Sequence, residues 1–188
     1  MRKFIGRGLF VFIILIVLIS QFPLGTVNAG QRGIRLRFGA VTNDVLNEGL
    51  YVRIPFVEQI VVMEVRVQKE EVKADAASKD LQTVQSDVAL NYHIEPSKVG
   101  LVYQELGRSY NERLIAPALQ EAVKASTAKF TAEELVSKRA IVSEDIKIIL
   151  REKLEKRGII VDDFAIVNFD FSKAFNEAIE SKVTAEQN

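Results

Sequence analysis

The stretch LFVFIILIVLI, residues 9–19, has no polar side chain, and no charged residue occurs from Gly8 through Gln31. A helix rises 1.5 Å per residue, so about 20 such residues span the ~30 Å hydrocarbon core of a bilayer. We therefore predict an N-terminal transmembrane helix within a membrane anchor over residues 1–28. Its apolar core consists of Leu9, Phe10, Val11, Phe12, Ile13, Ile14, Leu15, Ile16, Val17, Leu18 and Ile19.

The same segment is also typical of a cleavable signal peptide. Basic residues precede the apolar core, and Thr26 to Ala29 supply small or aliphatic side chains before a possible cut after Ala29. Cleavage would release a secreted or periplasmic soluble binding module, which is the alternative to an anchored protein. A re-entrant hairpin is disfavoured because Pro23 lies near the end of the apolar run, not at its middle.

The composition excludes several classes of function. Lys and Arg total 25, as do Asp and Glu, so no net charge attracts nucleic acid or acidic substrates. Cysteine is absent, which excludes disulfides, thiolate chemistry and cysteine metal ligands. The residues after the anchor suffice for one domain or two small subdomains.

Residues 29–95 predict a β-rich subdomain. Ile34, Leu36 and Phe38 alternate with arginines, which indicates a half-buried strand, and Asn43–Asp44 predicts a turn. A strand over residues 50–54 ends at Pro55, because proline lacks a backbone donor. Alternation over 61–67 and 84–94, separated by a polar loop at 74–80, predicts an antiparallel pair in a small, mainly antiparallel sheet with one wet face.

Residues 96–171 predict an α/β subdomain of packed helices and one strand. Apolar residues recur at helical spacing from Val99, and Pro117 predicts a kink or a restarted helix. Thr131 to Glu134 form a capping box that opens one long helix, which ends at Gly158. The alternation then predicts a strand over 159–171.

Residues 172–188 predict the start of a C-terminal coiled-coil helix. Its narrow apolar stripe is a possible oligomer contact, formed by Phe175, Ala178, Ile179 and Val183. A short helix of this kind is marginal without packing partners.

The residues provide little for catalysis. We expect no catalytic, cofactor-binding or metal-binding residue and no cofactor, because the sequence has no nucleophile elbow, zinc-binding, P-loop or dinucleotide-binding motif. His93, the single histidine, could act as a general base, but a lone histidine on a strand is more often a surface residue. Asp162–Asp163 could supply paired carboxylates, although a helix-to-strand turn explains them more simply.

Three arginines directly follow the predicted anchor. Arg32, Arg35 and Arg37 are possible lipid headgroup contacts, each contributing about 1 kcal/mol near an anionic surface. The alternative is an ordinary solvated strand face. The basic residues on the other flank, at Arg2, Lys3 and Arg7, nearly balance them, so charge alone leaves the orientation of the anchor open.

Several short motifs resemble a known superfamily. Residues 29–33 (AGQRG), Phe38–Gly39, residues 48–50 (EGL) and residues 54–56 (IPF) resemble the start of the stomatin/prohibitin/flotillin (SPFH, band 7) domain. Four later segments narrow the resemblance to the prohibitins, namely residues 78–82 (SKDLQ), 110–113 (YNER), 130–135 (FTAEEL) and 169–172 (FDFS) through Gln187. The match runs in order over nearly the whole chain.

The resemblance implies an α+β SPFH domain on an N-terminal anchor and a scaffold without an active site. It implies large rings or cages, either a homo-oligomer or a hetero-oligomer with a related chain, that organise membrane microdomains and modulate a membrane-bound AAA+ protease in protein quality control. Membrane lipid is a further implied partner.

The implied topology places the globular domain across the membrane from the N-terminus. A bacterial inner membrane is preferred and a mitochondrial one comes second. Prohibitins continue into a longer coiled coil than residues 172–188 provide, so we expect either a truncated sequence or assembly through the globular domain alone.

Overall fold

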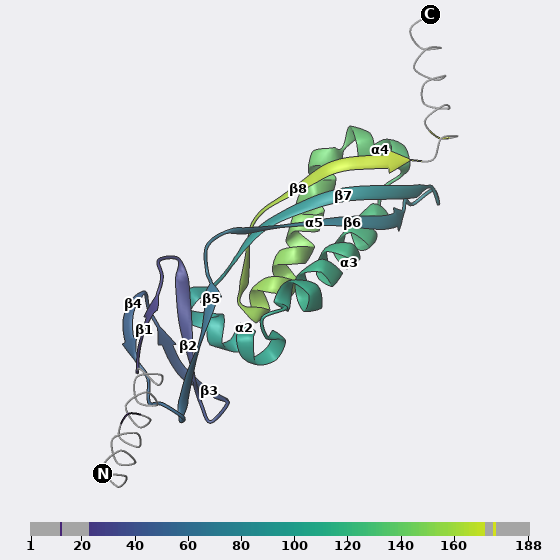
Figure 1. Ribbon diagram of the computed structural model, residues 1–188. Coiled ribbons are helices and arrows are strands. Elements are labelled where there is room, and N and C mark those ends of the chain that lie inside the picture. The colour runs from purple at the N-terminus through teal and green to yellow at the C-terminus, as the bar shows by residue number, and fades with distance from the viewer. Residues whose placement is uncertain (1–11, 13–22, 172–174, 176–188) are drawn as a thin grey trace, which may run out of the picture. The chain divides into compact units, whose positions relative to one another are not determined.

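The structure is a computed structural model that describes Phe12, residues 23–171 and Phe175. Its contacts divide the chain into two compact units, unit 1 (Met1–Glu64) and unit 2 (Val65–Asn188) (Figure 1). In the part of the chain that is described, no helix is both long and apolar enough to cross a membrane. Apart from Phe12, which is helical and exposed, the predicted anchor core lies outside the described residues.

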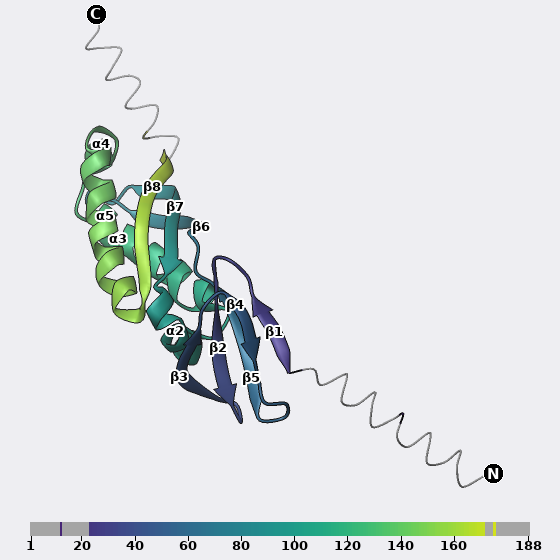
Figure 2. The same cartoon turned by 90° about the vertical axis from the view of Figure 1, so that its left-hand side faces the viewer.

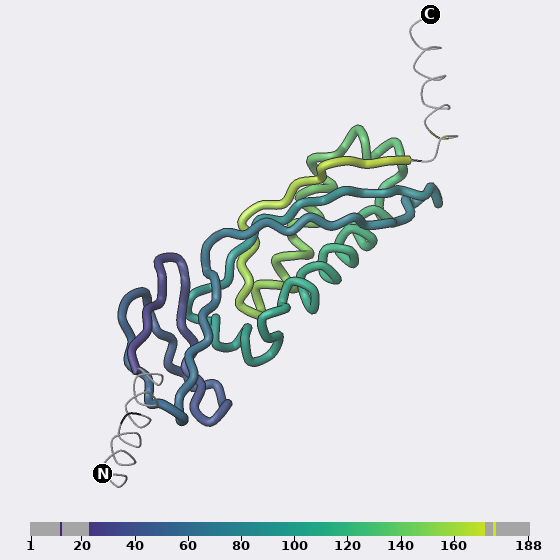
Figure 3. The backbone as a smooth tube through the Cα atoms, in the orientation of Figure 1, coloured from purple at the N-terminus to yellow at the C-terminus, as the bar shows by residue number. Residues whose placement is uncertain are grey.

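Unit 1 consists of two small antiparallel sheets, whose chain path can be followed in Figure 3. In the first, β1 (Leu24–Val27) pairs with β4 (Gly49–Val52). In the second, β2 (Gln31–Arg37) lies between β3 (Ala40–Leu46) and β5 (Glu58–Glu64). The unit buries Val27, Ile34, Leu36, Val61 and Met63.

Two local predictions in unit 1 are wrong. Asn43–Asp44 lies within β3 and not in a turn, because residues 40–46 pair with β2 across a bulge. Phe38 does not share the buried face of Ile34 and Leu36. It lies in the turn between β2 and β3, where a left-handed backbone directs its ring to solvent.

Unit 2 is built on a three-stranded antiparallel sheet. Its order is β6 (Gln68–Ala77), β7 (Thr83–Ile94), β8 (Ile159–Phe171), with β7 in the centre. Alternate β7 residues face the helices and are buried, namely Val84, Val88, Leu90, Tyr92 and Ile94. The other face of the sheet is mostly polar.

The strand over 84–94 is confirmed, but its predicted partner is wrong. Residues 58–64 form β5 and pair with β2, whereas β7 pairs with residues 68–77. The predicted polar loop at 74–80 is wrong for residues 74–77, which belong to β6. The strand continues to Ala77 because an edge strand with a solvated face tolerates that polarity.

Helices cover one face of the β6-β7-β8 sheet. They are the 3-10 helix η1 (Pro96–Lys98), α2 (Val99–Leu106), the π-helical turn η2 (Asn111–Ile115), α3 (Ala116–Thr127), α4 (Ala132–Ser137), α5 (Arg139–Leu154) and the 3-10 helix η3 (Glu155–Arg157). Figures 1 and 2 show α3 and α5 on the same side of the sheet. The interface buries Leu119, Val123, Ile146 and Leu150 completely.

The helix boundaries follow local chemistry. Pro117 lies in the first turn of α3, directly after the π-helical turn, so the predicted restart is confirmed. The capping box is confirmed, since Thr131 Oγ1 accepts from the Glu134 amide and Glu134 accepts from the Thr131 amide. The prediction of a single long helix is wrong. Lys138 has non-helical torsion angles (φ −110°, ψ 29°), and it separates α4 from α5. Gly158 ends the helical region with φ 79°, as predicted.

The division between the units differs in place from the change of pattern in the sequence. The contacts separate Glu64 from Val65, whereas the residue pattern changes at Pro96. The difference arises because β7 pairs with β6 on one side and with the much later strand β8 on the other. Both β6 and β7 therefore belong to the sheet of unit 2. Hydrophobic periodicity marks the type of each element but not its partner.

Candidate functional site

Large apolar side chains are exposed on unit 1. We call this set the unit 1 apolar surface; it consists of Leu24, Phe38, Leu50, Val52, Ile54 and Phe56. Leu24 lies directly opposite Val52 in the β1–β4 pair, so these two share one face of the sheet. Leu50 lies two residues before Val52 and so projects from the same face of this pair, and exposed apolar side chains that lie together on one face indicate a contact with an apolar partner.

Phe38 and Phe56 are held in an unusual backbone conformation. Their φ angles are 50° and 66°, and their side chains are 80% and 81% exposed. The left-handed region is unfavourable for a bulky side chain and persists only where the surroundings impose it. Here the Phe38 amide donates to the Val57 carbonyl at 2.9 Å, which links the two loops. Leu81 of unit 2 shares both features (φ 62°), so what sets Phe38 and Phe56 apart is that their loops are linked and lie in the unit that also exposes Leu50 and Val52.

Glu58 fixes these loops from within unit 1. Its side chain is nearly inaccessible and accepts from Arg37 at 2.9 Å, from the Ile54 amide at 3.0 Å and from Arg35 at 2.8 Å. These hydrogen bonds, from Arg37 first, lower the pKa of Glu58 to about 2. The carboxylate therefore joins β2, β5 and the loop that carries Phe56.

The three predicted headgroup contacts all have acidic partners. Arg32 pairs with Glu48 at 3.0 Å, while Arg35 pairs with Asp44 as well as with Glu58. Most of their charge is therefore compensated inside unit 1. Arg37 keeps more than half of its side chain exposed. A lipid role for these arginines stays a prediction.

His93 has a partner that the sequence did not identify. Its Nδ1 lies 2.8 Å from a carboxylate oxygen of Asp162, across the β7–β8 pair. Asp162 and Asp163 lie within β8 at a register shift, so the predicted turn is wrong. At this bulge Asp163 forms an ion pair with Lys147 of α5, with 3.1 Å between Oδ1 and Nζ. Each carboxylate is thus engaged separately, and the pair does not form a joint acid/base site.

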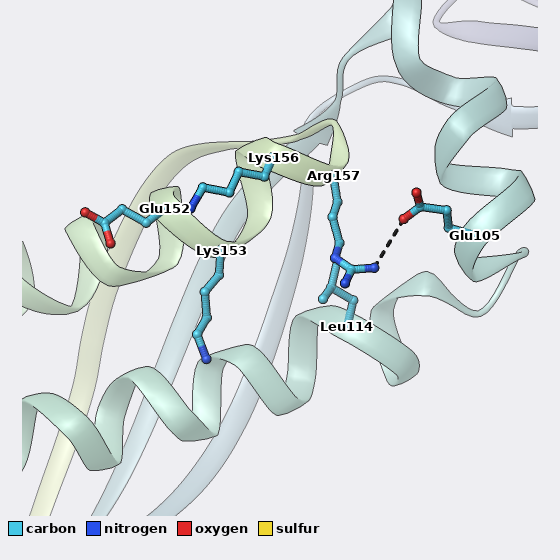
Figure 4. Close-up of a pocket in the computed structure, with 6 residues that line it drawn as sticks. All are labelled: Glu105, Leu114, Glu152, Lys153, Lys156 and Arg157. Carbon is cyan, nitrogen blue, oxygen red and sulfur yellow. Dashed lines mark hydrogen bonds and ion pairs between the residues drawn. The ribbon is translucent and has the colours of Figure 1, made fainter.

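Unit 2 has an open groove of about 870 Å³ between α2, η2 and the end of α5 (Figure 4). It is lined by Glu105, Leu114, Glu152, Lys153, Lys156 and Arg157. Arg157 closes one side through an ion pair with Glu105 at 3.2 Å. Its lining offers charges of both signs but no imidazole, thiol or hydroxyl group. The described residues also contain no group of three or more side chains that could hold a metal ion.

The remaining predicted residues lie mostly outside the described part. Of the C-terminal stripe only Phe175 is described, and its ring stacks at 5.0 Å from Phe171 at the end of β8. Ala178, Ile179 and Val183 lie outside, so the oligomer contact stays a prediction.

Sequence reasoning missed the apolar surface and Glu58. The turn signals Phe38–Gly39 and Pro55–Phe56 could have indicated exposed phenylalanines, because both pairs favour loops. Nothing around Glu58 distinguishes it from other surface glutamates, since its arginine partners are distant in sequence.

The described residues form an α+β domain of two compact units. The SPFH domain / Band 7 family model matches residues 25–188. The chain belongs to this family, and the expected resemblance is confirmed.

The curated relatives are prohibitins. The chain is 34% identical over 170 residues to the mitochondrial prohibitin complex protein 1 of Caenorhabditis elegans, which covers 90% of this chain and 62% of that protein. It is 36% identical over 166 residues to prohibitin-2 of Bos taurus, with coverage of 86% and 55%. It is 31% identical over 172 residues to prohibitin-1 of Colletotrichum higginsianum, with coverage of 91% and 62%. The chain thus spans between half and two thirds of the length of these relatives.

Proposed function

We propose that the protein is a membrane-anchored scaffold that assembles in many copies, in large rings or cages, and carries out no catalysis. The observation that carries this proposal is the unit 1 apolar surface, which begins at Leu24, within the last residues of the predicted anchor segment, and extends to Phe56. Two loops joined by a backbone hydrogen bond present Phe38 and Phe56 to solvent.

In this proposal the unit 1 apolar surface rests on the bilayer. Phenylalanine and leucine side chains exposed on one face can enter the boundary between lipid headgroups and acyl chains, where they leave water. Leu50, Val52 and Ile54 add apolar area beside them. If every copy is held against the membrane by this surface, neighbouring copies meet in a fixed orientation.

Assembly follows from the same attachment. Anchored copies diffuse in two dimensions, so their effective concentration is high and weak lateral contacts add up. The relatives include a protein named as part of a mitochondrial prohibitin complex, which supports assembly of the present chain. We extend the proposal to the organisation of membrane microdomains and to modulation of a membrane-bound AAA+ protease.

For localisation we propose a single-pass protein whose globular domain lies across the membrane from the N-terminus. A bacterial inner membrane is preferred over a mitochondrial one. The comparisons give no support to the secreted or periplasmic binding module as an alternative.

The experiment uses tryptophan as a reporter, because the chain contains none. Phe38→Trp and Phe56→Trp are prepared in the full chain, reconstituted in vesicles that contain brominated lipid. We expect blue-shifted, strongly quenched emission from both variants. Leu81→Trp is the matched control, since Leu81 is equally exposed on a left-handed backbone in unit 2 (φ 62°). Equal quenching at all three positions, or none at Phe38 and Phe56, would refute the proposed membrane contact.

A further inference from the structure

Strand β6 lies at an open edge of the unit 2 sheet. It pairs with β7 on one side, and no strand of the described residues pairs with its other side. Helix α3 packs against it from the helical face. An edge strand of this length presents a row of backbone donors and acceptors that can pair with another strand.

The opposite edge of the same sheet is closed by side chains of α5. Arg139 donates to the carbonyl oxygens of Ile166 and Val167 in β8. Ser143 donates to the carbonyl of Phe164. Side chains of α5 therefore occupy the middle of the β8 edge, whereas no described strand pairs with the outer edge of β6, so a partner strand would add at β6.

The solvent-facing side chains of β6 alternate in charge. Lys69, Glu71, Lys73 and Asp75 occupy successive positions on the solvated face. Within one copy, Lys69 pairs with Glu71, while Lys73 lies 3.8 Å from Asp87 and is 90% exposed. Lys73 is thus the charge of this row with most freedom to engage another strand.

This pattern is complementary to itself when the strand is reversed. In an antiparallel pair centred on Val72, Lys69 lies opposite Asp75 of the second copy and Glu71 lies opposite its Lys73. The two-fold symmetry repeats both contacts. Moving the register to the next same-face position in either direction brings Lys73 opposite Lys73 or Glu71 opposite Glu71, which is unfavourable. The charges therefore select one register.

We propose that β6 is a homotypic docking edge, through which two copies of this chain pair in antiparallel fashion about Val72. The result is one six-stranded sheet with the helices of both copies on the same face. Such a contact is isologous, so it joins two copies and closes. This pairing specifies one contact within the assembly proposed above, and it rests on that proposal; growth beyond pairs requires a second, different contact.

The register is tested with single cysteines, since the chain has none of its own. Val72→Cys brings two thiols directly opposite each other, within about 5 Å between Cβ atoms. Ala77→Cys is the control on the same strand, where ten residues of offset separate the two thiols by about 33 Å. With a short thiol cross-linker and the full chain in detergent, we expect a covalent dimer for Val72→Cys and none for Ala77→Cys.

The charge pattern is tested by reversal and exchange. Lys73→Glu places two glutamates opposite each other twice per dimer, so we expect the dissociation constant to rise roughly tenfold or more. The double variant Glu71→Lys/Lys73→Glu restores opposite charges in the same register with unchanged net charge. It should recover affinity to within about threefold of the original chain. Failure of this recovery would overturn the proposed register.

The outcomes separate this inference from the proposed function. Large assemblies without a Val72→Cys cross-link would refute pairing through β6 and leave the scaffold in place. Cross-linked dimers that never form larger particles would support the pairing and contradict the scaffold. Equal cross-linking of both cysteine variants would overturn the proposed pairing through β6, because it would show that the copies touch without a defined strand register.

Discussion

Replacing both exposed phenylalanines by asparagine should weaken the membrane contact and stabilise the folded unit. Phe38→Asn and Phe56→Asn remove the rings but keep a residue that tolerates a left-handed backbone. The opposite signs of the two effects distinguish a functional surface from ordinary surface variation.

The loss of membrane contact can be worked from the exposed area. A phenylalanine side chain exposes roughly 200 Å², and four fifths of each ring is accessible here. If the bilayer interface covers about half of that area, each ring contributes about 2 kcal/mol at ~25 cal/mol per Å². Both rings together contribute about 4 kcal/mol, which corresponds to nearly a thousandfold change in the equilibrium between the bound and released unit.

The reporter for this change is Leu50→Trp on β4, read by quenching with brominated lipid. We expect strong quenching with the phenylalanines present and little with both replaced. In thermal unfolding of the same chains, the free energy of unfolding should rise by about 1 kcal/mol per site, because asparagine relieves the backbone strain. Leu81→Asn is the control, with the same relief but unchanged quenching. Undiminished quenching in the double variant would refute the reasoning.

Four further predictions concern stability and the histidine. Because the pKa of Glu58 is lowered to about 2, its contribution to stability is present above about pH 4.3 and is lost as the pH falls toward 2; acid titration by circular dichroism should show this loss, and Glu58→Gln should flatten it. Gly158→Ala should cost about 1–2 kcal/mol in thermal unfolding, since a left-handed backbone and a Cβ only 2.7 Å from the Lys98 Cβ both oppose it; an unchanged melting temperature would contradict that packing. Thr131→Ala should cost about 1 kcal/mol by the same assay through loss of the α4 cap. His93→Ala should leave the assembly unchanged in native mass, and loss of any activity would revive a catalytic interpretation.

Local chemistry was readable from the sequence where neighbouring residues determine the structure. The capping box at Thr131, the stop at Gly158 and the alternation of β7 depend on nearby residues, and each was predicted correctly. The partner of β7 was not, because the choice between residues 61–67 and 68–77 depends on long-range pairing. The break at Lys138 also carried no sequence signal.

The candidate site was less predictable for the same reason. Arg35 and Arg37 were recognised as a basic cluster, but their shared partner Glu58 lies 21 or more residues away in sequence. Alternation assigned Phe38 to a buried face, whereas turn geometry exposes it. Binary patterning describes a strand well and fails at the first residue of a turn.

The central claim, a multi-copy membrane scaffold, is tested most directly by the size of the full chain extracted from membranes in mild detergent. Native mass spectrometry with single-particle imaging gives the number of copies per particle. A scaffold of this kind should be recovered as a large, uniform assembly of many copies. Monomers or isolated pairs alone, across mild detergents and in native membrane vesicles, would contradict it.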